Sequence, residues 1–232
     1  FTFDLTIYLN GLQKIYANAN ASYQFYLLGE VSDQPFWYYY IIAFLIKTPI
    51  ATLLTISAAA ILLIRNSQDR NKAVFLLTPA LLIIIVSCFD QSNLGYRRIL
   101  PALPFLLLFC AHTLSNTPSH LRKGFIAGLF CIAFLESFQI YPHHLSFFNQ
   151  AVGGPTRGPY LLDDSNIDWG QDLPGLLNWQ QNHPQARPLR QMYFGSLSPN
   201  VYGIQSETLP LNTTHITQPQ PGYYAISAHY LT

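Results

Sequence analysis

The sequence predicts a membrane α-helical protein with about four transmembrane helices, followed by a small extracytoplasmic α/β domain. Half of the 232 residues are hydrophobic and only 10% are charged, whereas about 25% are charged in an ordinary soluble domain. Long apolar runs recur through the middle of the chain. The segment after residue 141 instead mixes turn-rich stretches with short alternating ones, which is typical of a small folded domain outside the bilayer.

Four apolar runs predict the transmembrane helices. They cover residues 38–64, 73–89, 99–115 and 124–140. A helix needs about 20 mainly apolar residues, within a range of about 17–25, to cross the hydrocarbon core, so the last three runs are at the short limit. Core helices of a soluble protein are the alternative interpretation. Four such runs in succession, with almost no charge inside them, favour the membrane.

The charges between the runs predict which side each loop faces. Residues 65–72 carry three basic residues and one acidic residue, and residues 119–123 carry two basic residues. The positive-inside rule places both loops in the cytoplasm. The loop of residues 90–98 and everything after residue 141 then face the outside. We therefore expect a multi-pass protein of the inner (plasma) membrane, with its C-terminal domain on the periplasmic side.

Three segments follow from these boundaries. Residues 1–37 form an extracytoplasmic loop, in which apolar side chains at helical spacing predict a helix on the membrane surface. Residues 38–140 form the transmembrane region, and residues 141–232 form the extracytoplasmic α/β domain. The chain begins with Phe1 and stops at Thr232 inside a strand-like stretch, so we expect a piece of a longer protein.

The last segment contains one predicted helix and two predicted strands. Residues 173–183 predict a helix with Asp172 as its N-cap and a proline in its first turn. Residues 190–197 and 222–231 predict strands, because both stretches are aromatic and alternate in polarity.

Several classes of function are excluded by composition and motifs. The net charge of +1 offers no surface for a nucleic acid. No phosphate-binding loop, dinucleotide fingerprint, GxSxG or HExxH pattern occurs. Cys88, Cys110 and Cys131 all lie inside apolar runs without a CxxC pair, which predicts small buried hydrophobic residues rather than a metal or redox site. We therefore expect no cofactor and no metal.

Three basic residues are candidates for binding a phosphate at the membrane. Arg97 and Arg98 precede the third apolar run, and a guanidinium group matches phosphate oxygens with two donors. Snorkelling to lipid headgroups is the alternative. Lys47 lies about 13 Å into the first run at 1.5 Å per residue, and an ionisable residue at that depth usually faces a cavity or a partner. The Thr48-Pro49 step after it predicts a kink.

A polar cluster in residues 161–172 is the second candidate. The spacing of its acidic residues approaches that of a calcium loop, but Trp169 stands where glycine is required and Gly175 where glutamate is required, so an EF-hand is rejected. Three interpretations remain: a structural turn, another kind of calcium loop, and a lip that binds the substrate or the acceptor sugar. The candidate lip residues in this cluster are Asp164, Asn166, Asp168, Trp169 and Asp172.

A metal site is a weaker possibility near the end of the fourth run. Glu136 lies one turn from that end, and His143 and His144 follow it. Adjacent histidines point in different directions, whereas metal ligands must converge. Hydrogen-bonded residues at the interface are the preferred interpretation.

Three stretches together resemble a known family. They are YLLGEVSDQPFWYYYIIAFLIKTP (26–49), NLGYRRILPALPFLLL (93–108) and the most specific one, YPHHLSFFNQAVGGPTRGPYLLDDSNIDWGQDLPGLLNW (141–179). The chain resembles the C-terminal half of bacterial phospholipid-carrier-dependent glycosyltransferases, which are relatives of the dolichyl-phosphate-mannose–protein mannosyltransferases of the GT-C class. The resemblance covers most of residues 23–205.

The resemblance implies an enzyme that transfers a mannose-like hexose from a polyprenyl-phosphate donor to a glycan, lipid or protein acceptor on the outer face. Such enzymes invert the anomeric centre in one displacement, with a carboxylate as general base. That carboxylate is expected upstream of Phe1. Arg97 and Arg98 match the basic pair of the family, and Lys47 matches its Lys-Thr-Pro. Glu30 and Asp33 lie where the outer loop approaches the membrane and are further candidates for the substrate lip.

Two other classes of function remain open. A transporter or flippase would place Lys47 and Glu136 in a polar pathway, and it predicts more intramembrane charges together with paired helix breaks in repeated halves. A membrane-anchored binding module without catalysis would lack an acidic residue in its first outer loop.

Overall fold

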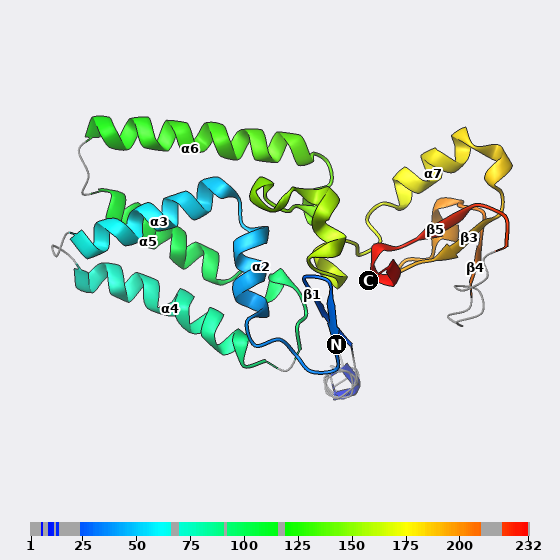
Figure 1. Ribbon diagram of the computed structural model, residues 1–232, viewed down its shortest axis with the longest axis horizontal. Helices are drawn as coiled ribbons and strands as arrows, with labels where there is room; N and C mark the ends of the chain where they lie inside the picture. Colours follow the sequence, from blue (N-terminus) through cyan, green and yellow to red (C-terminus); the bar gives the residue numbers. More distant parts are fainter. Residues whose placement is uncertain are drawn as a thin grey trace.

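The computed structural model describes residues 6, 9–11, 13, 24–65, 70–90, 92–115, 119–209 and 220–231, without the side chains of Ser119, Leu121 and Asp164. It consists of an apolar helical bundle and a small α/β unit. Residues 141–172, here called the connecting segment, run between the two parts (Figure 1).

Five helices form the bundle. They are α2 (Tyr39–Lys47), α3 (Ile50–Arg65), α4 (Arg70–Cys88), α5 (Ala102–Ser115) and α6 (Ser119–Ile140). Helix α5 packs against α3 and α4, and α6 packs against α3. Buried alanines at these contacts, among them Ala59, Ala73, Ala80 and Ala102, let helix backbones approach closely. The prediction of a largely helical middle region is therefore confirmed.

The predicted single helix over residues 38–64 is two helices. Helices α2 and α3 meet at an angle of 111°, because Pro49 has no N–H to donate and disfavours helical backbone at Thr48. Among the described residues, two helices are long and apolar enough to cross a membrane, Arg70–Cys88 and Arg122–Ile140, or three if α2 and α3 count as one broken span. Helix α5 is apolar but too short to be counted among them.

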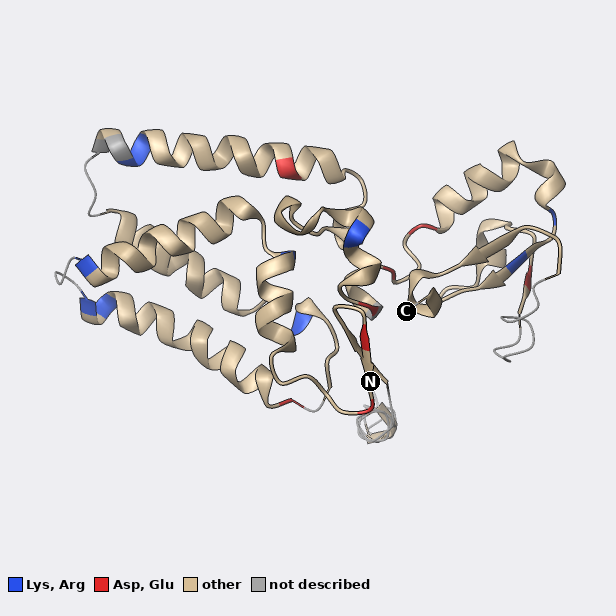
Figure 2. Cartoon of the chain, in the orientation of Figure 1, with Lys and Arg blue, Asp and Glu red and all other residues tan. Residues whose placement is uncertain are grey.

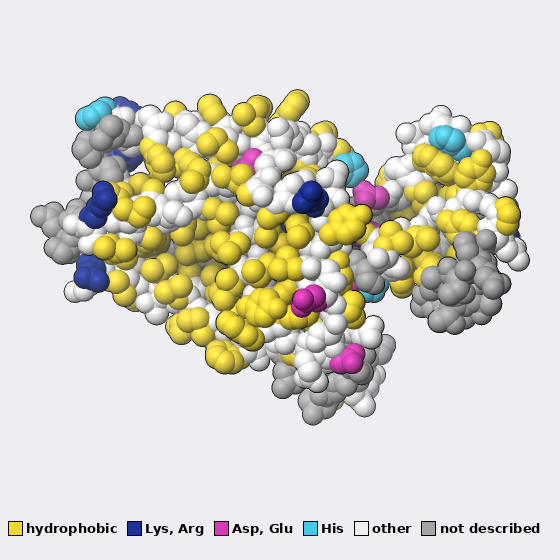
Figure 3. All heavy atoms as spheres, viewed as in Figure 1, with side chains coloured by type: hydrophobic (Ala, Val, Ile, Leu, Met, Phe, Trp, Pro, Cys, Tyr) yellow, Lys and Arg dark blue, Asp and Glu magenta, His cyan; other side chains and the backbone are white. Residues whose placement is uncertain are grey.

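The surface of the bundle is apolar over wide areas (Figure 3). Large side chains such as Phe75, Val86, Phe130 and Phe138 are exposed, and few residues of α4 and α6 are buried inside the protein. Helices that are apolar on all sides require apolar surroundings. The bundle therefore has the surface of a membrane protein.

Basic side chains gather at the end of the bundle that is distant from the α/β unit (Figure 2). This basic end consists of the last residue of α3 and the first turns of α4 and α6, with Arg65, Arg70, Lys72, Arg122 and Lys123. The two loops that the sequence predicts on one side of the membrane thus lie at the same end of the bundle.

The α/β unit contains one helix and a three-stranded parallel sheet. Helix α7 (Leu173–Asn182) is followed by β3 (Leu189–Met192), β4 (Ser206–Thr208) and β5 (Tyr224–Ile226), in the order β4-β3-β5. Its core joins α7 to the sheet through Leu173, Ala186, Leu189 and Ile204. The predicted α7 is confirmed almost to its ends. Both predicted strands are shorter than expected, and β4 was not predicted.

A hairpin precedes the bundle. Strands β1 (Phe25–Leu27) and β2 (Glu30–Ser32) pair in antiparallel fashion around Leu28 and Gly29. Both turn residues have positive φ, as the two central residues of a type I′ hairpin turn require. The N–H of Leu28 donates to the carbonyl of Leu161, so the hairpin is attached to the connecting segment. The surface helix predicted within residues 1–37 lies mostly outside the described residues.

The break between α2 and α3 exposes backbone groups that other elements satisfy. Glu136 of α6 accepts a hydrogen bond from the N–H of Ile50, the first residue of α3, at 3.0 Å. Asn149 donates from its amide to the carbonyls of Leu45 at 2.7 Å and Thr48 at 3.0 Å. Unpaired backbone groups are costly in an apolar environment. Glu136 and Asn149 therefore stabilise the bend.

Replacing Glu136 tests this role. Glu136→Leu should lower the free energy of unfolding in detergent micelles by about 1–2 kcal/mol, the usual loss when a helix cap is removed. Glu136→Gln keeps an acceptor and should lose less. Ser137→Ala, at the exposed neighbouring position, is the matched control. Equal stability of Glu136→Leu and the wild type would show that the carboxylate does not stabilise the bend.

Candidate functional site

The predicted site residues lie at the end of the bundle opposite the basic end. There the loop of residues 92–101, the connecting segment and the α/β unit come together (Figure 1). The sequence predicted these residues as one phosphate-binding group and one substrate lip. In the structure, members of the same predicted group differ from one another in exposure and in hydrogen-bond partners.

Lys47 lies inside a polar junction and is directed away from solvent. Its side chain is 8% exposed. The ammonium donates to the carbonyl of Leu145 at 2.8 Å and to the carbonyl of Asn166, and it lies 4.5 Å from the centre of the Phe148 ring. The ammonium thus uses two of its three donors on backbone carbonyls and lies against an aromatic ring. In this arrangement Lys47 joins the connecting segment to the end of α2.

Asn166 is a second member of this junction. It is 2% exposed, and its amide oxygen accepts from the N–H of Tyr96 at 2.9 Å. Its amide nitrogen donates to the hydroxyl of Tyr39 and to the carbonyl of Asp163, both at 2.8 Å. The amide is thus fully used within the chain. Asn166 therefore holds the polar cluster to Tyr39 and Tyr96. These contacts fit the interpretation of the cluster as a structural turn better than its interpretation as a substrate lip.

Arg97 differs from the other two predicted phosphate ligands in having no hydrogen bond or ion pair among the described residues. It is exposed on a short helical turn, Tyr96–Arg98, and its guanidinium carbon lies 5.1 Å from the centre of the Trp169 ring. Stacking on an aromatic face fixes the plane of a guanidinium group and leaves its N–H donors at the edge. No ion pair of Arg97 occurs within the described part of the chain.

Arg98, by contrast, is already paired. Its guanidinium forms an ion pair with Asp90 and donates to the hydroxyl of Ser92 at 3.2 Å. Both partners belong to the same loop as Arg98, so the pair shapes this loop after α4. The structure therefore does not present Arg97 and Arg98 as one clamp.

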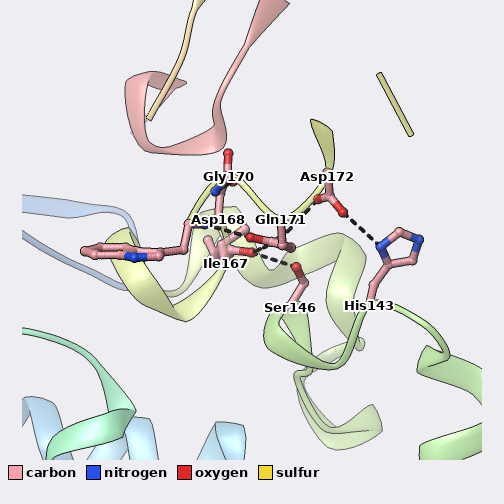
Figure 4. A network of polar contacts seen from close by, with 8 residues as sticks. His143, Ser146, Ile167, Asp168, Gly170, Gln171 and Asp172 are labelled. Atoms are coloured by element: carbon pink, nitrogen blue, oxygen red, sulfur yellow. Dashed lines mark hydrogen bonds and ion pairs between the residues drawn. The ribbon is translucent and has the colours of Figure 1, made fainter. Parts of the chain in front are cut away.

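The segment of residues 167–172 forms a compact polar turn (Figure 4). The carboxylate of Asp168 accepts from the N–H of Gly170 at 2.8 Å, and Gln171 donates to the carbonyl of Ile167 at 3.0 Å. Ser146 also donates to that carbonyl, at 2.7 Å. Aspartate and neighbouring polar side chains stabilise turns in this way. Gly170 has φ of +80° and leaves no room for a Cβ beside the hydroxyl of Tyr193.

Instead of capping the helix that follows it, as the sequence predicted, Asp172 contacts a histidine with its carboxylate. Helix α7 begins directly after it, but its carboxylate makes no cap hydrogen bond. Instead it lies 3.0 Å from Nδ1 of His143 (Figure 4). A second pair, His229 Nδ1 with Asp163 at 2.8 Å, joins the end of the described chain to the connecting segment. The first pair joins the two ends of the connecting segment, and the second ties the α/β unit to it.

The remaining predicted residues lie apart from this turn or outside the description. Glu30 and Asp33 are exposed on and after β2. The side chain of Asp164 is not among the described ones. Among the described residues, no group of three His, Cys, Asp or Glu side chains could hold a metal ion. Cys110 is buried as predicted, whereas Cys131 is exposed on α6.

A cavity of about 530 Å³ lies between the polar turn and the α/β unit. Its walls come from the turn, from α7, from β3 and β5, and from the residues just beyond the carboxyl ends of both strands. They include Asp168, Asp172, Leu176, Trp179, Gln191 and Tyr193. This size is typical of small-molecule sites, and the carboxyl ends of parallel strands are where open α/β sheets bind ligands. Burial, and secondarily the carboxylate of Asp168, raises the pKa of the Tyr193 phenol, so this hydroxyl remains protonated at neutral pH.

Sequence reasoning missed Trp179, Gln191 and Tyr193 as cavity residues. It placed all three within predicted elements, but no motif marks them. One signal was present. Gln191 and Tyr193 share a face of the predicted strand over residues 190–197, and Leu189 directly before it continues that alternation, so a polar Gln occupies a face that is otherwise apolar or aromatic.

No family model, curated protein or solved structure matches the chain. The geometry and chemistry of the site therefore carry the functional argument together with the resemblance of the three quoted stretches.

Replacing Lys47 tests its structural role. Lys47→Met keeps the length of the side chain but leaves two buried carbonyls without their charged donor. Each such loss costs about 1–3 kcal/mol, so the free energy of unfolding in detergent micelles should fall by about 2–6 kcal/mol. Lys123→Met, at the exposed basic end, should change it little. If Lys47→Met were as stable as the wild type, the junction would not depend on this ammonium.

Proposed function

We propose that the chain is the C-terminal part of a membrane glycosyltransferase. It would transfer a mannose-like hexose from a polyprenyl-phosphate donor to an acceptor on the extracytoplasmic face. The observation that carries this proposal is an exposed guanidinium, that of Arg97, held on the face of Trp169 at the end of an apolar bundle. The three stretches that resemble the family contribute both residues.

The position of Arg97 suits a lipid phosphate. The phosphate of a polyprenyl donor lies at the membrane surface while its chain lies in the hydrocarbon region. A donor at its oxygens stabilises the negative charge that develops as the bond from the phosphate to the sugar breaks. Arg97 lies next to the first residues of α5, where such a headgroup would meet the bundle. The general base is expected in the part of the protein that precedes Phe1.

The proposal includes four spans and one orientation. Helices α3, α4, α5 and α6 would each cross the bilayer, with α2 at the outer surface and the basic end in the cytoplasm. Five basic residues at that end support this orientation. The connecting segment and the α/β unit would then lie outside, beside Arg97.

Labelling of single cysteines tests the orientation. In a protein whose three cysteines are replaced, Ser196→Cys in the α/β unit should react with a membrane-impermeant maleimide in intact cells. Asn71→Cys at the basic end should react only after permeabilisation. Both positions are exposed, so neither is shielded by the fold. The reverse pattern would overturn the orientation and with it the proposed outer-face reaction.

Transfer by the full-length protein tests Arg97. Loss of one donor to a developing anion typically lowers the rate by about 10²–10³-fold, so Arg97→Ala should lower transfer from polyprenyl-phosphate-mannose by that order. Arg97→Lys keeps the positive charge but loses the planar guanidinium that stacks on Trp169, so it should retain part of the activity. Arg98→Ala should have a smaller effect, because its guanidinium is already paired with Asp90.

Lys123→Ala, a basic residue at the opposite end, is the control for general charge effects. Full transfer by Arg97→Ala at the wild-type expression level would refute the phosphate role of Arg97.

A further inference from the structure

An unpaired buried amide marks a ligand site that is separate from Arg97. The side chain of Gln191 is 6% exposed, and its amide oxygen has no hydrogen-bond partner in the described part of the chain. It lines the cavity of about 530 Å³ described above. Buried polar side chains are nearly always hydrogen-bonded in native proteins. The missing partner of Gln191 therefore points to a molecule that occupies the cavity.

The sheet register leaves space in front of this amide. Gln191 lies on the middle strand, and alternation places it on the same face as Leu189, which packs under α7. Its neighbours across the ladder are Thr208 of β4 and Ala225 of β5, and the alanine side chain is too small to cover the amide on the β5 side. The cavity thus extends from the amide to the carboxyl ends of both strands.

The walls favour an uncharged, polyhydroxylated ligand. Trp179, which is 38% exposed, and Tyr193 supply aromatic surface. Asp168, Asp172 and Ser146 contribute oxygen atoms to the lining. Among the described residues that line the cavity there is no Lys or Arg, and two carboxylates repel a phosphate. Aromatic surface suits the C–H face of a sugar ring, while carboxylate and amide groups bind its hydroxyls.

We propose that this cavity binds a neutral saccharide, with the amide of Gln191 as a hydrogen-bond partner at its inner end. That the saccharide belongs to the acceptor rests on the proposed function, whereas saccharide binding itself does not. The donor phosphate at Arg97 and the saccharide in the cavity would then lie on the two sides of the turn of residues 167–172, which contributes Trp169 to the first and Asp168 to the second.

Binding to the full-length protein in lipid nanodiscs tests the proposal. Saturation-transfer NMR with maltose and with N,N′-diacetylchitobiose should show binding of at least one of these neutral disaccharides. Glucose 6-phosphate should bind more weakly than the disaccharide that binds. Gln191→Leu removes the amide while retaining bulk and should weaken saccharide binding by about tenfold, the equivalent of one good hydrogen bond. Gln181→Leu, on the exposed side of α7, is the matched control and should bind as the wild type does.

A stability measurement separates a ligand-binding role from a structural one. An amide oxygen without a partner among the described residues does not stabilise the fold, so the melting temperature of unliganded Gln191→Leu should equal or exceed that of the wild type. A clear fall in melting temperature would assign Gln191 to the fold and overturn the proposal. So would the absence of binding by both disaccharides, unchanged binding by Gln191→Leu, or a preference for glucose 6-phosphate.

The variant Arg97→Ala distinguishes this proposal from the proposed function. It should retain disaccharide binding while losing transfer. Retained transfer together with retained binding would contradict the transferase role of Arg97 and support the saccharide site. If Arg97→Ala loses transfer and the wild-type protein binds neither disaccharide, the result would support the role of Arg97 and overturn the saccharide site.

Discussion

The buried ammonium of Lys47 is the interaction on which the arrangement of the other parts depends. It lies where α2 ends, and its two carbonyl partners come from residues 98 and 119 positions further along the chain. Burying a charge is favourable only when the group is well hydrogen-bonded, so the segments that carry Leu145 and Asn166 are held to this point. The connecting segment therefore has one defined path across the end of the bundle.

The Thr48-Pro49 break has a related consequence. Because proline ends α2, the backbone groups on both sides of the break need partners from elsewhere. Glu136 and Asn149 supply them, and the hydroxyl of Thr48 lies 2.9 Å from that of Tyr96. The short turn that carries Arg97 is thus joined to the same break. The position of the exposed guanidinium follows from polar contacts within the bundle end and from its stacking on Trp169.

The polar turn of residues 167–172 separates two chemically different surfaces. One side presents a cation on an aromatic ring, and the other borders a cavity with carboxylates and no cation among its described lining residues. A charged headgroup suits the first surface, and a neutral hydroxylated ligand suits the second. The proposed transfer, in which a sugar leaves its lipid phosphate and is joined to an acceptor hydroxyl, would need two such surfaces close together.

The apolar runs, the helix after Asp172 and the two strands could be predicted from the sequence, because local periodicity and proline placement determine them. The kink at Thr48-Pro49 was also foreseen, but its angle depends on the packing of α3 against α5 and α6. The role of Lys47 was not foreseen, since its partners are distant in sequence. For the same reason Asn166 appeared as a lip residue, although a buried tyrosine and two backbone groups use its amide.

The sequence by itself determined which segments are apolar, which residues carry charge and where proline interrupts a helix. Only the tertiary structure decided which of those charges remain available. Arg98 pairs with Asp90, Asp172 with His143, and Lys47 with backbone carbonyls. Arg97 remains exposed, and the amide oxygen of Gln191 has no partner among the described residues. The physical reason is that a polar group's chemistry depends on its nearest neighbours in space, and folding brings those neighbours from distant parts of the chain.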